Sequence, residues 1–112
     1  MKDITVVING AGAAGIAIGT FLLNMGIGNL IMVDINGIIN RDDKYENPAH
    51  AEMAVKSNKN NIKGGLSEAM KGADVFIGVS KPGLVSEDMI KSMAEKPIVF
   101  AMANPCLLYT SD

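Results

Sequence analysis

The chain contains few of the residue types that define several large classes of protein. Its 112 residues include one cysteine, Cys106, which excludes an internal disulfide and a multi-cysteine metal site. Tryptophan is absent and aromatic residues make up 4% of the chain, so no platform for stacking bases is visible. The ten basic residues form no block and the net charge is −2, which argues against nucleic acid as a partner. A lone cysteine fits a reducing compartment, and we expect a cytoplasmic location.

Charge is also missing from a long N-terminal stretch. No charged residue occurs from Ile4 to Val33, and these 30 positions are long enough to span a bilayer. Three asparagines and six glycines interrupt the stretch at the points where a strand–turn–helix–turn–strand unit needs them. We therefore expect no membrane span. A signal peptide is not expected either, because Asp3 follows Lys2 and the cleavage region would be a glycine motif.

What the chain does have is a regular alternation of apolar runs and helical segments. The composition is 48% hydrophobic and 20% charged, which is typical of a globular domain. Apolar runs predict strands at 4–8, 29–33, 75–79 and 98–102. Helices are expected at 13–25, from Asn47-Pro48 to about 56, at 66–70 and at 86–94, with a loop over 36–45. The pattern predicts an α/β domain with a doubly wound, mostly parallel sheet of about four strands, in an order near 3-2-1-4-5.

A glycine motif joins the first strand to the first helix. It reads Gly10, Ala11, Gly12, Ala13, Ala14, Gly15, which is a G-x-G-x-x-G pattern. The first glycine permits a tight turn, the second lets backbone approach a pyrophosphate, and the third lets helix and strand pack closely. The start of the helix would then offer free N–H groups to the phosphates. The motif follows a strand and opens a helix, so we interpret it as a Rossmann-like dinucleotide site.

An acidic residue ends the second strand at the expected distance. Asp34 lies 19 residues after Gly15, close to the ~20 of the dinucleotide-binding pattern. Its carboxylate is expected to accept hydrogen bonds from the adenosine ribose and to repel a 2′-phosphate, which favours NAD over NADP. Arg41 and Lys44 follow shortly after and would weaken that preference if the loop folded back.

Polar residues also follow the third and fourth strands, at the same rim of the expected sheet. The turn from Ser80 to Gly83 would line the nicotinamide-ribose side, although an ordinary strand-to-helix turn is an equal reading. Lys81 has nothing that places it near a reacting atom. Asn104 precedes Pro105, and taken alone a turn-forming Asn-Pro is the favoured reading. His50 sits in a predicted helix, where a surface or packing role is favoured over catalysis.

Three segments of this sequence resemble bacterial malic enzymes. They are VINGAGAAGIAI (7–18), GADVFIGVSKPG (72–83) and IVFAMANP (98–105), and the resemblance covers residues 3–105. In that family the enzyme oxidises malate with NAD or NADP and then decarboxylates the product to pyruvate with a divalent metal, Mg or Mn. The resemblance implies that residues 10–15 hold the pyrophosphate, Asp34 the ribose, and Val79 and Ser80 border the dinucleotide. It implies that Asn104 contacts the substrate.

The resemblance also implies what this chain lacks. The family's catalytic tyrosine, lysine base and metal-binding acids lie upstream of the first strand, so no catalytic residue and no metal ligand is assigned here. We expect residues 1–105 to be the cofactor domain of a larger, usually oligomeric enzyme, and inactive alone. Residues 106–112 resemble the translation of a transposase adapter from DNA libraries, which predicts a non-native tail.

Two other functions remain open from the sequence. One is the cofactor domain of a different Rossmann dehydrogenase, such as an amino-acid or shikimate type. The other is a free-standing nucleotide-binding module that is not an enzyme.

Overall fold

The computed structural model describes residues 3–79 and 87–101, and strands alternate with helices through both segments. The elements are β1 (Thr5–Asn9), α1 (Ala13–Asn24), β2 (Asn29–Asp34), β3 (Gly37–Ile38), α2 (Pro48–Lys56), α3 (Leu66–Met70), β4 (Val75–Gly78), α4 (Glu87–Lys91) and β5 (Ile98–Ala101). The strands form one sheet in the order β3-β2-β1-β4-β5, in which only β2 and β3 pair antiparallel. The expected α/β class and mostly parallel sheet are confirmed.

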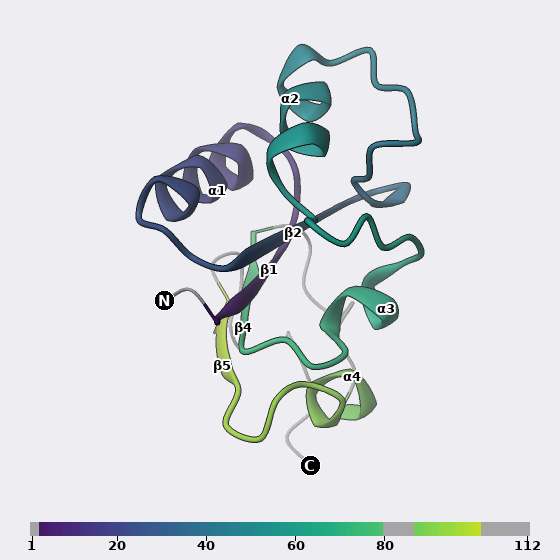
Figure 1. Cartoon of the computed structure of the whole chain (residues 1–112). Helices are drawn as coiled ribbons and strands as arrows, with labels where there is room; N and C mark the ends of the chain where they lie inside the picture. Colours follow the sequence, from purple (N-terminus) through teal and green to yellow (C-terminus); the bar gives the residue numbers. More distant parts are fainter. Residues whose placement is uncertain (1–2, 80–86, 102–112) are drawn as a thin grey trace.

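The sheet is covered on both faces, which is why the central strands are apolar between their polar end residues. In β1, Val7 packs with Phe76 and Met70 in one buried cluster, whereas Val6 and Ile8 belong to a second cluster. The second cluster lies against α1 and α2, and the first lies against α3 and α4 (Figure 1). Because side chains alternate across a strand, a run such as Val6 to Ile8 feeds both cores.

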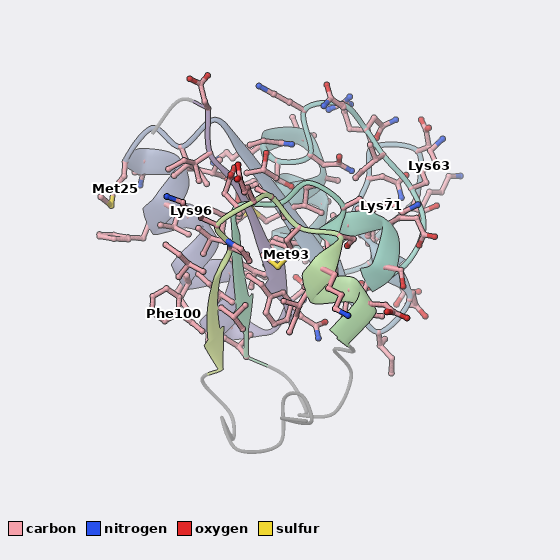
Figure 2. The ribbon with its side chains drawn as sticks, turned by 90° about the horizontal axis from the view of Figure 1, so that it is seen from below. Met25, Lys63, Lys71, Met93, Lys96 and Phe100 are labelled. Atoms are coloured by element: carbon pink, nitrogen blue, oxygen red, sulfur yellow. The ribbon has the colours of Figure 1, made fainter. Side chains whose placement is uncertain are left out.

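Apolar side chains remain exposed at one side of the sheet. Phe21 on α1 and Met25 at the C-terminal cap of α1 are 62% and 52% exposed, and Ile98 and Phe100 on β5 are 52% and 54% exposed. Figure 2 shows Met25 and Phe100 at the periphery, while Met93 lies inside and is 7% exposed. Single exposed apolar residues are common on protein surfaces, and these four lie on or next to α1 and β5.

The loop expected at 36–45 contains a fifth strand, and this is the main correction to the predicted topology. The Asn36 amide donates to the Asp34 carboxylate at 2.7 Å, and Gly37 has a φ of +119°. These two features turn the chain back on itself, so that Val33 pairs with Ile38 in a short antiparallel hairpin. A two-residue strand has no periodicity to detect in the sequence.

The last helix is shorter than expected. It ends at Lys91 rather than near Ala94, and its expected start at Ser86 lies outside the described residues. The residues after Lys91 bond instead to the turn before β4: the Gly72 amide donates to the Ser92 carbonyl, and the Ala94 amide donates to the Ala73 carbonyl, both at 2.8 Å. Tertiary hydrogen bonds therefore replace the last helical turn.

A buried asparagine fixes the segment that follows α2. Asn58 is 1% exposed and has a left-handed φ of 52°. Its side-chain amide donates to the carbonyls of Ile39 and Ile62, and its side-chain oxygen accepts from the Ile62 amide at 3.0 Å. Asparagine tolerates this backbone conformation better than most residues, and its side chain satisfies groups that water cannot reach.

Replacing Asn58 with alanine is expected to lower the free energy of unfolding by about 2–4 kcal/mol. The variant leaves buried carbonyls unpaired and places an alanine in the left-handed region. Urea denaturation followed by circular dichroism measures the change. Asn60→Ala is the matched control, because Asn60 is exposed two residues away, and an equal loss in both variants would contradict this role for Asn58.

Candidate cofactor site

A cleft of about 1080 Å³ opens at the carboxyl ends of β1 and β2. Its lining residues come from the glycine turn and the start of α1, from the end of β2 and the turn after it, from the starts of α2 and α3, and from the end of β4. They are Asn9, Gly10, Ala11, Gly12, Ala13, Ala14, Gly15, Val33, Asp34, Ile35, Asn36, Gly37, Asn47, His50, Gly65, Leu66 and Val79. The structure thus brings together all of the described residues that the sequence assigns to the cofactor.

The glycine turn is tied to β2 by a backbone hydrogen bond, and its first and third glycines lie close together. The Gly10 amide donates to the Val33 carbonyl at 2.8 Å, and Gly10 has a φ of +125°, which a side chain rarely adopts. A Cβ built on Gly15 would lie 1.8 Å from the Gly10 carbonyl oxygen. The first and third glycines of the motif are therefore required by the fold itself.

Gly12 differs from both of these glycines, because the space that its side chain would occupy is open. A Cβ built there meets no heavy atom within 4 Å, and the residue lines the cleft. Gly12 is also the cap of α1, and no side chain caps this helix. The first N–H groups of a helix lack partners within it and carry partial positive charge. The open space beside Gly12 suits a pyrophosphate bound to these donors.

Asp34 ends β2 at the edge of the same cleft. Its side chain is 13% exposed, and one carboxylate oxygen accepts from the Asn36 amide at 2.7 Å. The other oxygen lies 4.0 Å from Nδ1 of His50. The carboxylate is thus oriented by the Asn36 amide and retains lone pairs for a ligand hydroxyl.

The Arg41 side chain is bonded away from this carboxylate. The Arg41 guanidinium donates to the carbonyls of Asn58 and Lys59, at 3.3 and 3.5 Å. Among the described residues that line the cleft, neither Arg41 nor Lys44 is present. The loop therefore does not fold back as it would have to do to offset the charge of Asp34.

The sequence did not place His50 at the site, although the structure does. Its Nε2 lies 2.7 Å from the Ala11 carbonyl oxygen, and its ring packs edge-on against Tyr45 with centroids 6.1 Å apart. Burial raises the pKa of Tyr45 above its ordinary value, and its hydroxyl accepts from the Asn40 amide at 3.0 Å. The available signal was weak: Asn47-Pro48 puts His50 in the first turn of α2, at the end that faces β2.

Of three further residues predicted to border the cofactor or substrate, only one lies within the described part of the chain. Val79 lines the cleft, and its amide donates to the Asn9 carbonyl at 3.0 Å. Ser80 and Asn104, like Lys81 and the tail 106–112, lie outside the described residues. Within residues 3–79 and 87–101, no group of three or more histidine, cysteine or acidic side chains is placed to hold a metal ion. In the same segments, no helix is long and apolar enough to cross a membrane.

The fold and the cleft define a class of protein. A parallel sheet with a G-x-G-x-x-G turn, an open helix N-terminus and an acid at the end of the second strand is a Rossmann-like dinucleotide-binding domain. Residues 1–110 match the family described as "Malic enzyme, NAD binding domain". The chain belongs to this family, which decides against the amino-acid or shikimate dehydrogenase alternative.

Individual relatives agree with this assignment. An NAD-dependent malic enzyme of Geobacillus stearothermophilus is 54% identical over 105 residues, which are 94% of this chain and 22% of the relative. A probable NADP-dependent malic enzyme of Rickettsia prowazekii is 39% identical over 94% of this chain and 14% of its own length. The crystal structure of an NAD-dependent malic enzyme from Thermotoga maritima superposes with a TM-score of 0.90 at 41% identity, over 97% of this chain and 29% of that one. The chain therefore spans about a fifth of the NAD-dependent curated relative.

Proposed function

We propose that this chain binds NAD in the cleft between the glycine turn and Asp34, as the cofactor domain of an enzyme that oxidises and decarboxylates malate. The observation that carries the proposal is the contrast between Gly12 and Gly15. The third glycine is enclosed by protein, whereas the second faces open space at the start of α1, where a pyrophosphate would lie. The open space beside Gly12 and the N–H groups at the start of α1 both suit a pyrophosphate.

Different residues of the cleft are proposed to contact different parts of the dinucleotide. The turn 10–15 and the start of α1 hold the pyrophosphate, and Asp34 accepts hydrogen bonds from the adenosine ribose. Val79 and Ser80 border the dinucleotide towards its nicotinamide end, and Asn104 contacts the substrate. When bound, the nicotinamide supplies the acceptor for a hydride from malate. The described residues orient that acceptor and exclude water from one wall of the site.

The remaining chemistry belongs to the parent enzyme. Removal of the malate hydroxyl proton requires a base, and loss of CO2 from the oxidised product leaves an enolate that requires an acid. We assign neither role, and no ligand of the parent's divalent metal, to a described residue of this chain. We place the parent in the cytoplasm as an oligomer of identical subunits, without nucleic acid or membrane as partners.

NAD is proposed as the preferred cofactor, with NADP bound more weakly. The carboxylate of Asp34 would repel a 2′-phosphate, and the nearby guanidinium of Arg41 is bound to carbonyls instead. Relatives named for each cofactor occur in the family, so the preference rests on these side chains and not on the family.

Isothermal titration calorimetry of the chain with NAD and NADP tests the proposal. Asp34→Ala is expected to weaken NAD binding about tenfold, through loss of a charge-assisted hydrogen bond, and to reduce the preference for NAD over NADP. Asp88→Ala is the matched control, because it removes the same charge from an exposed position on α4. Unchanged NAD binding in the Asp34 variant would contradict the ribose contact, and a wild-type chain that binds neither dinucleotide would contradict the function.

A further inference from the structure

Among the described residues, His50 makes the only side-chain hydrogen bond to the peptide that joins Ala11 to Gly12. The acceptor is the Ala11 carbonyl oxygen, 2.7 Å from Nε2. A carbonyl oxygen can only accept, so Nε2 carries the proton in this contact. The bond joins α2 to a turn 39 residues away. The bond therefore fixes the glycine turn through a residue that lies outside the G-x-G-x-x-G motif.

The helix that presents His50 is itself firmly placed. The Asn47 side chain caps α2 by accepting from the Ala49 amide at 2.8 Å. Met53 and Ala54 on the same helix are 2% and 4% exposed and pack in the cluster that includes Ile8. Tyr45 supports the imidazole from the side. Because the backbone of α2 is anchored, only the side-chain torsions of His50 remain to be fixed for the imidazole to reach Ala11.

A planar trans peptide turns this contact into control of the pyrophosphate site. In such a peptide the C=O and the next N–H point in opposite directions. A bond that fixes the Ala11 carbonyl therefore also fixes the direction of the Gly12 N–H, at the cap of α1 beside the cleft. Glycine adopts both signs of φ with similar ease, so Gly12 alone would not prevent this peptide from rotating.

We propose that His50 is a positioning residue, which holds the Ala11–Gly12 peptide in the one orientation that directs its N–H to the dinucleotide pyrophosphate. This inference rests on the proposed function, since it names a residue that acts on the same site through the turn. The expected effect of losing this bond differs between ligands. Loss of the bond weakens ligands that contain a pyrophosphate and leaves the binding of adenosine, which has no phosphate, unchanged.

Two substitutions separate the hydrogen bond from the bulk of the ring. His50→Leu fills the space without a donor, whereas His50→Gln keeps an N–H able to reach the Ala11 carbonyl. The leucine variant is expected to bind NAD about tenfold more weakly and adenosine within about twofold of wild type, and the glutamine variant to bind NAD within about threefold. His50→Ala repeats the test without the bulk of leucine. Val55→Ala is the control, because Val55 lies on α2 and is 71% exposed.

The measurements are NAD titration by calorimetry, adenosine titration by NMR, and the position of the Gly12 amide resonance in each ligand-free variant. The Gly12 resonance is expected to move in the leucine variant and to return in the glutamine variant. Equal losses for NAD and adenosine, absence of rescue by glutamine, or unchanged NAD binding in the leucine variant would each overturn the positioning role. A wild-type chain that binds no NAD overturns the proposed function and this inference together, whereas the other outcomes overturn the inference alone.

Discussion

Replacing Gly15 with alanine is expected to abolish cooperative folding or to lower the free energy of unfolding by about 3 kcal/mol or more. The added Cβ would lie 1.8 Å from the Gly10 carbonyl oxygen and 3.0 Å from the carbonyl carbon. Both are backbone atoms, and Gly10 is tied to β2 by the bond from its amide to the Val33 carbonyl. Over-packing costs about 1–3 kcal/mol where side chains yield, and backbone yields less.

The size of the chain makes this loss severe. Domains of this size have a total stability on the order of 5–15 kcal/mol, and short chains bury a smaller fraction of their surface. A loss of 3 kcal/mol therefore lowers the melting temperature by roughly 12 °C or more. Thermal unfolding followed by circular dichroism measures it. Gly12→Ala is the control from the same motif, since its Cβ meets no protein atom within 4 Å. A Gly15 variant as stable as the Gly12 variant would show that the turn yields.

The parts of the fold that the sequence predicts are those with a long local signal. Strands such as β1 and β2 are continuous apolar runs, and each is close to its expected bounds. The cap at Asn47 followed by Pro48 marks the start of α2 correctly. The spacing from Gly15 to Asp34 predicts that both line one cleft, because the carboxyl ends of neighbouring parallel strands meet at one edge.

The parts that could not be predicted depend on contacts between distant segments. β3 has two residues and arises from the turn that Asp34 and Gly37 make. His50 reaches Ala11 because α2 packs on the core cluster that also lies against α1. The sequence pattern of residues 47–56 predicts a helix but does not show which segment the first turn of that helix contacts. A histidine between two alanines is read from the sequence as a surface or helix-packing residue, and only the tertiary structure shows that its partner is the glycine turn.

The same contacts explain why the two layers contribute differently to function. The α1 and α2 layer contains the turn, the cap of α1 and His50, so its core supports the cleft directly. The α3 and α4 layer buries Phe76 and Met70 and holds the central strands in register. Substitutions in the α3 and α4 layer are expected to change stability first, whereas those at the cleft change binding first.

Substitutions of Gly12 are expected to change NAD binding strongly and the free energy of unfolding little. Replacing it with valine is expected to weaken NAD binding at least about a hundredfold, because the side chain would occupy the space where backbone must approach the pyrophosphate. The residue has φ −79° and ψ −168°, an extended conformation that valine adopts readily. Nothing in the protein lies within 4 Å of its Cβ position. The free energy of unfolding should therefore stay within about 1 kcal/mol of wild type.

Glycine, alanine and valine at position 12 form a series of increasing side-chain size. Gly12→Ala is expected to weaken NAD about tenfold, between wild type and valine, while adenosine binds all three chains alike because it lacks the pyrophosphate. Calorimetry with NAD, NMR titration with adenosine and urea unfolding of each variant give the three quantities. If valine left NAD binding intact, the pyrophosphate would not pass over Gly12, and the assignment of the glycine turn would be wrong. If binding and stability fell together, Gly12 would belong to the fold, as Gly15 does, and the open space beside it would not be the site.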